Sequence, residues 1–257
     1  MLTTKRRGAS SHGCFRERES RVFSLSLPNG KATFSNTFQE PLLVVAGGRK
    51  PAASWLAEIF RSFTTRWCAD SGLVYCLEAG ILPDRLVGDG DSTPPDEWRR
   101  AVEAGVSVTK HPVDKDLTDL QLALFTAGKE LPGKPVLVTG CWGGRFDHLW
   151  ANIFSALWAA EQDIRILVFA DEKECLFLLE GEEALEICVS GRENVVVSLL
   201  PLTPECAGVD LQNVRWELKD SLLLQKHPYT VSNRTEGNKN ISVRLQKGIL
   251  GVYCGWL

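Results

Sequence analysis

The sequence lacks paired cysteines, long apolar runs and a large surplus of charge of either sign. Its eight cysteines are scattered over 257 residues with no C-x-x-C pair, which disfavours a zinc site or a thioredoxin-type redox site. No apolar run approaches about 18 residues and no secretory signal is visible, so no transmembrane helix is predicted. A net charge of −3, from 29 basic and 32 acidic residues, is unsuited to broad nucleic-acid binding. We therefore expect a cytoplasmic protein with reduced thiols that binds neither membranes nor nucleic acid.

Two common nucleotide-binding signatures are also missing. The sequence holds no G-x-x-x-x-G-K-[ST] segment, and no G-x-G-x-x-G follows its first predicted strand. These absences disfavour P-loop enzymes and dinucleotide-binding Rossmann domains. Apart from a glycine-rich start, the protein-kinase signatures are missing as well.

The composition, 44% hydrophobic and 24% charged, is that of a chain with a sizeable core. Residues 1–21 carry six basic and two acidic residues with little apolar periodicity, which indicates a tail. Residues 22–34 alternate in polarity around Pro28-Asn29-Gly30, a pattern typical of a β-hairpin. We therefore treat residues 1–40 as an N-terminal extension, a tail with a possible hairpin.

Short apolar runs alternate with helical patterns from residue 41 onward. The predicted strands are 42–46, 66–69, 84–87, 106–108 and 135–138, and the predicted helices are 53–63, 73–79, 95–103, 117–131 and 149–158. This alternation predicts a mostly parallel sheet with helices on both faces. Residues 41–162 are therefore predicted to form a three-layer α/β domain.

The helical period ends near residue 163. The β-like runs that follow are 164–169, 175–179, 185–189, 195–199, 214–218, 241–245 and 249–253, separated by glycine and proline. Such spacing is typical of an all-β sandwich or a small barrel. Residues 163–257 are therefore predicted to form a second, all-β domain.

Several glycines and aspartates directly follow predicted strands. Because ligands of open parallel sheets bind beyond the carboxyl ends of the strands, these segments should share one rim: Gly47-Gly48, Asp70, Gly88–Asp91 and Gly140–Asp147. Asp89 and Asp91 flank a glycine, so a turn there can aim both carboxylates at one hard cation such as Mg²⁺. The alternative is an ordinary Asp/Gly-rich surface turn.

Acidic residues also gather at the start of the helix predicted from residue 117. Asp116 and Asp119 are three residues apart and share a face. They either support a site or cap the helix and stabilise its first turn, and the two roles are compatible. Lys115, between acids, is placed to hold a phosphate or to offset local charge.

Residues 140–148 form a glycine-rich turn that leads into a helix. Glycines let the backbone approach a ligand, and the N-terminus of the helix suits an anion. Arg145 can bind phosphate oxygens with two parallel hydrogen bonds. Asp147 either caps the helix or binds a polar ligand, whereas His148 is better explained as an ordinary residue of the helix start.

The predicted rim thus gathers many carboxylates beside two cations. The acidic residues are Asp70, Asp89, Asp91, Asp116, Asp119 and Asp147. Unpaired carboxylates repel one another, and a divalent metal bound with a polyphosphate removes that conflict. Phosphoryl-type transfer needs mainly positioning and charge neutralisation, which metals, Arg145 and Lys115 provide.

Four stretches, in this order, resemble the thiamine pyrophosphokinase family. They are Ala69-Asp-Ser-Gly72, residues 81–92 with Gly88-Asp-Gly-Asp-Ser92, Asp114-Lys-Asp-Leu-Thr-Asp119, and Gly140-x-x-Gly-Gly-Arg-Phe-Asp-His148 leading into Ala151-Asn152. Weaker echoes follow at 208–218 and at Ser232-Asn233. The resemblance covers roughly residues 42–257.

The resemblance implies an α/β domain followed by a β-sandwich, in a homodimer with active sites between subunits. The implied reaction converts thiamine and ATP into thiamine diphosphate and AMP, with Mg²⁺ held by Asp89, Asp91 and Asp119. Asp70 would lie near the reacting groups and orient the thiamine hydroxyl. The implied nucleotide or diphosphate contacts are Lys115, Asp116, Thr118, Arg145 and Asp147, and the thiamine contacts are Ser232 and Asn233. Some members carry an aromatic residue after Ser-Asn that stacks on thiamine; here Tyr229 and Trp256 are the candidates for that contact.

Three other functions are compatible with the same residues. The first is a pyrophosphokinase for another hydroxymethyl heterocycle, such as a pterin. The second is a regulator that binds nucleotide or thiamine without catalysis, and the third is a metal-dependent phosphohydrolase. Release of AMP with a panel of acceptors distinguishes them.

Overall fold

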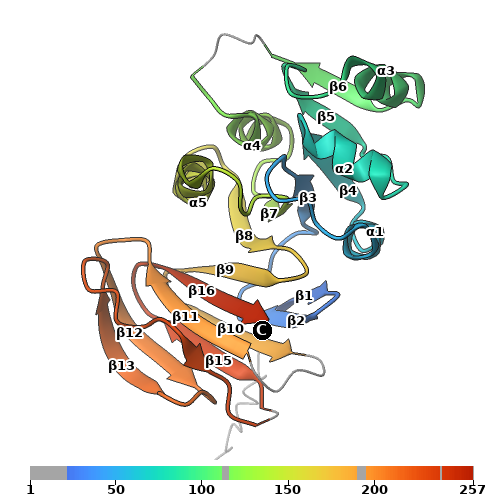
Figure 1. Ribbon diagram of the computed structural model, residues 1–257. Helices are drawn as coiled ribbons and strands as arrows, with labels where there is room; N and C mark the ends of the chain where they lie inside the picture. Colours follow the sequence, from blue (N-terminus) through green and yellow to red (C-terminus); the bar gives the residue numbers. More distant parts are fainter. Residues whose placement is uncertain (1–21, 112–115, 190–194, 238, 257) are drawn as a thin grey trace, which may run out of the picture.

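The computed structural model describes residues 22–111, 116–189, 195–237 and 239–256, which form two β-sheets and five helices (Figure 1). The larger sheet has ten strands in the order β14-β11-β16-β9-β8-β7-β3-β4-β5-β6. The smaller sheet has six strands in the order β1-β2-β10-β15-β12-β13. The larger sheet therefore runs without a break from the helical part of the molecule into the all-β part.

One half of the larger sheet is parallel and carries all five helices. Its strands are β8 (Arg165–Ala170), β7 (Pro135–Thr139), β3 (Leu42–Val45), β4 (Thr65–Ala69), β5 (Arg85–Gly88) and β6 (Ser107–Lys110). The helices are α1 (Ala53–Arg61), α2 (Gly72–Glu78), α3 (Pro95–Glu103), α4 (Asp119–Glu130) and α5 (Phe146–Ala160). The predicted three-layer α/β arrangement is confirmed.

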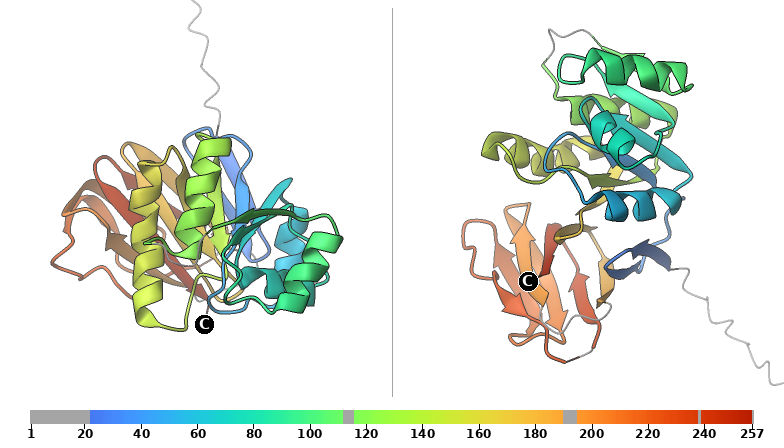
Figure 2. Two further views of the ribbon diagram at one scale, coloured as in Figure 1. Left: turned by 90° about the horizontal axis from the view of Figure 1, so that it is seen from above. Right: turned by 45° about the vertical axis from the view of Figure 1, so that its right-hand side comes forward.

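Alternating side chains of the strands pack into two separate cores. On β3, Leu43 and Val45 join the core under α1 and α2, whereas Leu42 and Val44 join the core under α4 and α5. Successive side chains of a strand point to opposite faces, so a strand that is apolar throughout needs helices on both sides. The left view of Figure 2 shows α4 and α5 side by side over one face of the sheet.

Helix α5 leaves two of its large aromatic side chains exposed. Its buried side chains are small ones, Ser155, Ala156 and Ala159. Trp150 is 55% exposed, and Phe146 is 75% exposed. The small residues let the helix approach the sheet closely, which leaves a row of large aromatic side chains on its outer side.

The second half of the molecule is an antiparallel β-sandwich. One layer is the end of the larger sheet, with β9 (Glu174–Glu180), β16 (Ile249–Trp256), β11 (Val195–Pro201) and β14 (Asn233–Arg234). The other layer is the smaller sheet, with β1 (Phe23–Leu27), β2 (Gly30–Phe34), β10 (Glu183–Val189), β15 (Ile241–Leu245), β12 (Glu205–Gln212) and β13 (Leu218–Leu224). Both layers contribute to one buried core. The predicted sandwich is confirmed.

The N-terminal hairpin is part of this sandwich. β1 and β2 pair with each other as the turn at Pro28-Asn29-Gly30 predicts, and β2 also pairs with β10, so that Phe34 lies opposite Leu185. Phe34 is fully buried. Strand β8 lies in the parallel part of the larger sheet although it follows residue 163. The division at residues 40 and 162 stays a prediction.

One predicted strand of the second half is wrong. Residues 214–218 lie mostly in a turn, and the strands there are β12 and β13 on either side of it. Gly208 has a φ of +63° and the pairing of β12 with β13 shifts register near it, so the apolar residues of β12 lose strict alternation. A bulge of this kind hides the period of two that identifies a strand.

All seven described cysteines are free thiols, and six of them are buried: Cys68, Cys76, Cys141, Cys175, Cys206 and Cys254. Burial raises the pKa of the Cys141 thiol well above its usual value, which keeps it protonated and unreactive. Cys14 lies outside the described residues. Among the described residues, none of the helices is both long and apolar enough to cross a membrane.

Candidate active site

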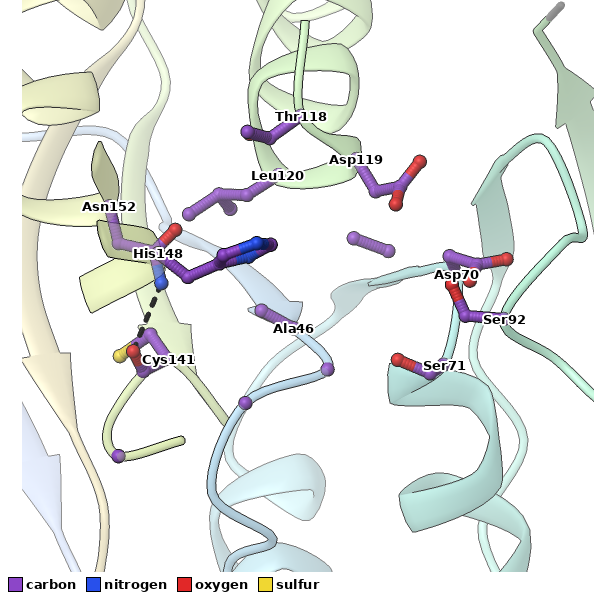
Figure 3. Close-up of a pocket in the computed structure, with 14 residues that line it drawn as sticks. Ala46, Asp70, Ser71, Ser92, Thr118, Asp119, Leu120, Cys141, His148 and Asn152 are labelled. Carbon is purple, nitrogen blue, oxygen red and sulfur yellow. Dashed lines mark hydrogen bonds between the residues drawn. The ribbon is translucent and has the colours of Figure 1, made fainter. Parts of the chain in front are cut away.

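A pocket of about 360 Å³ opens at the carboxyl ends of the parallel strands. The loops after β3, β4, β5 and β7 and the starts of α4 and α5 line it, through Ala46, Gly47, Gly48, Ala69, Asp70, Ser71, Ser92, Thr118, Asp119, Leu120, Cys141, Gly143, His148 and Asn152. The predicted meeting of these loops on one rim is confirmed. Figure 3 shows Asp70, Ser92 and Asp119 on one side of the pocket and His148 and Asn152 on the other.

Three carboxylates gather at the acidic side of the pocket. Oxygens of Asp70, Asp89 and Asp91 all lie within 4.8 Å of one another. Asp70 and Asp89 are 1% and 7% exposed, whereas Asp91 is open to solvent. The predicted metal set contains Asp119 in place of Asp70; Asp119 faces the same side of the pocket but is not part of this close group (Figure 3).

The backbone holds Asp70 in an unusual conformation. Its φ is +37°, a value that residues with a side chain seldom adopt and that tends to occur at functional sites. Its amide donates to the carbonyl of Val87, and Thr93 Oγ1 donates to its Oδ1 at 3.2 Å. A Cβ on Gly88 would lie 2.9 Å from the Cβ of Asp70, so glycine is needed there for the aspartate to fit.

The group of aspartates suits a divalent cation. Asp70 Oδ2 is buried and has no hydrogen-bond partner. Carboxylate oxygens of Asp89 and Asp91 lie within 4.8 Å of a carboxylate oxygen of Asp70, and ionised carboxylates cannot donate hydrogen bonds to one another. A hard cation between the three residues would satisfy these oxygens and neutralise their mutual repulsion.

The start of α4 places two predicted residues, Thr118 and Asp119, in the pocket and leaves Asp116 outside it. Thr118 caps the helix: its Oγ1 accepts from the amide of Gln121, whose side chain accepts from the amide of Thr118. The cap is therefore Thr118 and not Asp116, which lies before the helix and is exposed. Thr118 and Asp119 both line the pocket. Lys115 lies outside the described residues.

Arg145 and Asp147 bind each other at the rim. The guanidinium donates from Nε at 3.1 Å and from Nη2 at 2.5 Å to the carboxylate, and this hydrogen-bonded pairing lowers the pKa of Asp147. Both side chains are mostly exposed, at 74% and 61%, and neither lines the pocket. The preceding Gly143 and Gly144 both have positive φ, which turns the chain so that Arg145 projects outward.

Two polar residues of α5 line the pocket although neither was among the predicted site residues. His148 projects into the pocket from the first turn of α5, although its sequence position indicated an ordinary helix residue (Figure 3). Asn152, one turn later, donates to the carbonyl of Cys141 at 3.0 Å and thereby fixes the turn after β7. Their spacing of four places both side chains on one helix face, which is a signal that the sequence contains.

Ser232 and Asn233 lie far from this pocket within one chain. Asn233 belongs to β14 at the opposite edge of the larger sheet, with six strands between β14 and β4. At about 4.8 Å per strand this separation is roughly 30 Å. Ser232 is exposed and has a φ of +61°. Within a single chain, the structure therefore does not bring the two residues together with the aspartates.

The amide of Asn233 is occupied by the backbone. It accepts from the amide of Trp216 at 3.1 Å and donates to the carbonyl of the same residue at 2.7 Å. Asn233 therefore holds a loop that displays Trp216, whose side chain is 57% exposed beside Ser232-Asn233. The sequence-based candidates for an aromatic contact, Tyr229 and Trp256, did not include this tryptophan because it precedes Ser232 by sixteen residues.

Two family models match most of the chain. The model described as thiamin pyrophosphokinase, catalytic domain, matches residues 56–168, and the model for the vitamin B1 binding domain of the same family matches residues 185–250.

Curated relatives and solved structures agree with these models. Thiamine pyrophosphokinase of Bacillus subtilis is 28% identical over 207 residues, which are 80% of this chain and 94% of that protein. Thiamine pyrophosphokinase 1 of Arabidopsis thaliana is 31% identical over 54% of this chain and 53% of its own length. The crystal structure of the B. subtilis protein has a TM-score of 0.71 at 26% identity, covering 84% of this chain and 98% of that one. Both domain models, the full-length bacterial relative and its structure agree, and the chain belongs to the thiamin pyrophosphokinase family.

Proposed function

We propose that this chain transfers the β,γ-diphosphate of ATP to the hydroxyl of thiamine, giving thiamine diphosphate and AMP. In this reaction the hydroxyl oxygen of thiamine forms a bond to the β-phosphorus. The bond from that phosphorus to the oxygen bridging to the α-phosphate breaks, and the hydroxyl proton is lost. The observation that carries the proposal is the group of Asp70, Asp89 and Asp91 at one side of a pocket large enough for a small ligand.

Mg²⁺ is the proposed cofactor. Asp70, Asp89 and Asp91 would hold it, with Asp119 on the same side of the pocket as a further carboxylate beside the same phosphates. When bound, such an ion neutralises phosphate charge and orients the diphosphate for attack.

The other residues of the pocket suggest where the substrates lie. The triphosphate would lie at the acidic side, and the rest of ATP would extend past Leu120 toward His148 and Asn152. Glycines at positions 47, 48 and 143 allow main-chain groups to approach the phosphates. Asp70, buried and free at one oxygen, would orient the thiamine hydroxyl as well as face the cation. Lys115, Asp116, Thr118, Arg145 and Asp147 remain proposed contacts of the nucleotide or diphosphate, with Arg145 exchanging its bond to Asp147 for one to phosphate.

The thiamine contacts point to a homodimer. We keep Ser232 as a proposed thiamine contact, assign Asn233 the task of holding the neighbouring loop, and add Trp216 as the aromatic surface. Thiamine is too short to span roughly 30 Å, so residues of β14 reach an aspartate group only if the two come from different copies. The active site would then lie between two subunits, each contributing one half to each of two sites.

Two exposed apolar surfaces support that assembly. One is the α5 row, in which the rings of Phe146 and Trp150 lie 6.0 Å apart and those of Trp150 and Phe154 lie 4.7 Å apart. The other is on the sandwich, where the large exposed side chains are Trp216, Leu222, Tyr229 and Val231. Contiguous apolar patches of this kind mark contact surfaces. The α5 row begins at Phe146, two residues before His148 of the pocket, and the sandwich residues include Val231, which precedes Ser232, and Trp216, which hydrogen-bonds to Asn233. Joining the two surfaces would bring the two halves of the site together.

The cytoplasm is the proposed compartment. The seven cysteines within the described residues are free thiols, six of them buried, which suits a reducing environment in which disulfides do not form.

Formation of AMP from ATP and Mg²⁺, with and without thiamine, tests the proposal directly. We expect AMP only when thiamine is present, matched one to one by thiamine diphosphate. Phosphate release without thiamine would indicate a phosphohydrolase instead. AMP release with a pterin but not with thiamine would assign another acceptor, and binding of Mg-ATP without AMP formation would contradict catalysis.

Replacing Gly48 with alanine should weaken Mg-ATP binding. The added Cβ would lie 2.7 Å from the carbonyl oxygen of Gly140 and 2.8 Å from that of Trp142, both backbone atoms, so the two pocket loops must separate. We expect the Kd of Mg-ATP, measured by calorimetry, to rise at least about tenfold. The control is Gly251→Ala, where the nearest atom at 2.9 Å is the flexible end of Leu176. An unchanged Kd in Gly48→Ala would remove this loop from the nucleotide site.

A further inference from the structure

The glycine loops of the pocket depend on contacts that lie behind them. Gly47 and Gly48 follow β3, and Cys141 and Gly143 follow β7. The amide of Gly48 donates to the carbonyl of Gly140 at 2.5 Å, and the amide of Arg49 donates to that of Trp142 at 2.5 Å. The two loops are therefore one unit. The side chain of Arg49 extends from this unit away from the pocket.

Arg49 joins the loop unit to the turn between β8 and β9. Its Nε and Nη2 donate to Asp171 Oδ2 at 2.9 and 2.5 Å, and Nη2 also donates to Glu174 Oε1 at 2.5 Å. A planar guanidinium shared by two carboxylates has a fixed direction, unlike a lysine ammonium. The position of this turn therefore fixes the position of Arg49.

The turn itself is rigidly built. Asp171 is fully buried, and its other oxygen accepts from the amides of Lys173 and Glu174 at 2.8 and 3.1 Å. Glu174 accepts from the hydroxyl of Tyr253 on β16 at 2.8 Å. A buried carboxylate with four donors is held in a single orientation.

The N-terminal hairpin completes the chain of contacts. Asn29, at its turn and 7% exposed, donates to the carbonyls of Asp171 and Glu172, each at 3.3 Å. Its Oδ1 accepts from Trp55 Nε1 of α1 at 2.9 Å. The hairpin is thereby tied both to the β8–β9 turn and to the helix that follows the first glycine loop.

We propose that Asn29, Asp171 and Arg49 form a positioning relay that sets the spacing of the two glycine loops for Mg-ATP. None of the three residues lines the pocket, and all lie outside the segments 56–168 and 185–250 that the family models match. The N-terminal hairpin thus contributes to substrate binding without touching the substrate. The identity of the substrate rests on the proposed function; the existence of the relay rests on the contacts alone.

Arg49→Lys and Asn29→Ala test the relay. The chain offers matched controls in a second buried ion pair that has no link to the pocket. There Arg165 donates to both oxygens of Glu183 at 2.7 and 2.6 Å, and Asn36 donates to the same carboxylate at 2.6 Å. Arg165→Lys and Asn36→Ala therefore remove comparable bonds elsewhere.

The measurements are the KM values for Mg-ATP and thiamine, the melting temperature, and amide hydrogen exchange of residues 46–49 and 140–144. We expect Arg49→Lys to raise the KM for Mg-ATP at least about tenfold and Asn29→Ala about threefold, with the KM for thiamine within about twofold. Exchange of both glycine segments should become faster. The Arg165 and Asn36 controls should lower the melting temperature by similar amounts while leaving the KM values and the exchange of these segments unchanged.

Two outcomes would overturn the relay. One is that Arg49→Lys leaves the exchange of both glycine segments as in the wild type. The other is that Arg165→Lys changes the KM values for Mg-ATP and thiamine by the same factors as Arg49→Lys. Arg49 would then only stabilise the fold. If the wild-type protein forms no thiamine-dependent AMP, the proposed function fails, and the exchange comparison still decides the relay.

Discussion

Replacing Asp91 with asparagine should lower thiamine-dependent AMP formation at least about 100-fold. The substitution removes one charge from a group of three carboxylates within 4.8 Å, and with it a ligand oxygen for the proposed cation. Asp91 is exposed, so the variant should fold and melt like the wild type. The measurement is the rate of AMP formation as a function of Mg²⁺ concentration, in which the variant should need more Mg²⁺ to reach a lower maximum.

The matched control for this variant is Asp96→Asn. Asp96 lies nearby on α3, its side chain is 90% exposed, and its carboxylate pairs with Arg99 on the surface. The Asp96→Asn variant loses the same charge as Asp91→Asn but at a position outside the pocket. Its rate of AMP formation should therefore match that of the wild type. Wild-type activity in Asp91→Asn, or an equal loss in both variants, would contradict the role assigned to the aspartate group.

Mixing two inactive variants should restore activity if each active site contains residues of two chains. Asp91→Asn damages the aspartate half of a site, and Trp216→Ala damages the proposed thiamine half, the latter by about 30-fold at low thiamine concentration. The two variants are co-expressed with different tags. If the chains assort at random, half of the dimers contain one chain of each variant, and each of these mixed dimers carries one intact site. The mixture should therefore reach about a quarter of the wild-type rate.

A site complete within one chain predicts a different result. Each mixed dimer would then carry two damaged sites, and the mixture would be no more active than the average of the two variants. The double variant Asp91→Asn/Trp216→Ala, co-expressed with the wild type, is the control for tag and expression effects. In a mixed dimer of this pair, the wild-type chain supplies only one half of each site, so both sites should be damaged.

The sequence predicts the parallel half of the fold well because its strands are short, apolar and separated by helical patterns. From that topology alone follows the meeting of Asp70, Asp89 and Asp119 at one edge. The direction of side chains within the loops does not follow from it. Arg145, for which a phosphate contact stays a prediction, binds Asp147 in this structure, where two successive glycines with positive φ precede it.

The contacts between distant segments could not be predicted from one sequence. Asn233 was a thiamine contact by resemblance, yet its amide hydrogen-bonds to the backbone of Trp216. Asn29, within a turn motif, was evident as a turn residue, but its partner Asp171 lies 142 positions later. Periodicity describes which face of an element is buried; it does not identify the partner across such a separation.

The position of the N-terminal hairpin in the smaller sheet also affects the order in which parts of a newly translated chain can fold. β2 finds its partner β10 about 150 residues later, so the hairpin leaves the ribosome long before its neighbour exists. At roughly 5–20 residues per second this delay lasts on the order of ten seconds, and contacts of such large sequence separation form slowly even afterwards. Because Asn29 on this hairpin supports the glycine loops, residues that are translated early are among the last to reach their native positions. A newly made chain should therefore acquire its parallel sheet before it gains the ability to bind nucleotide.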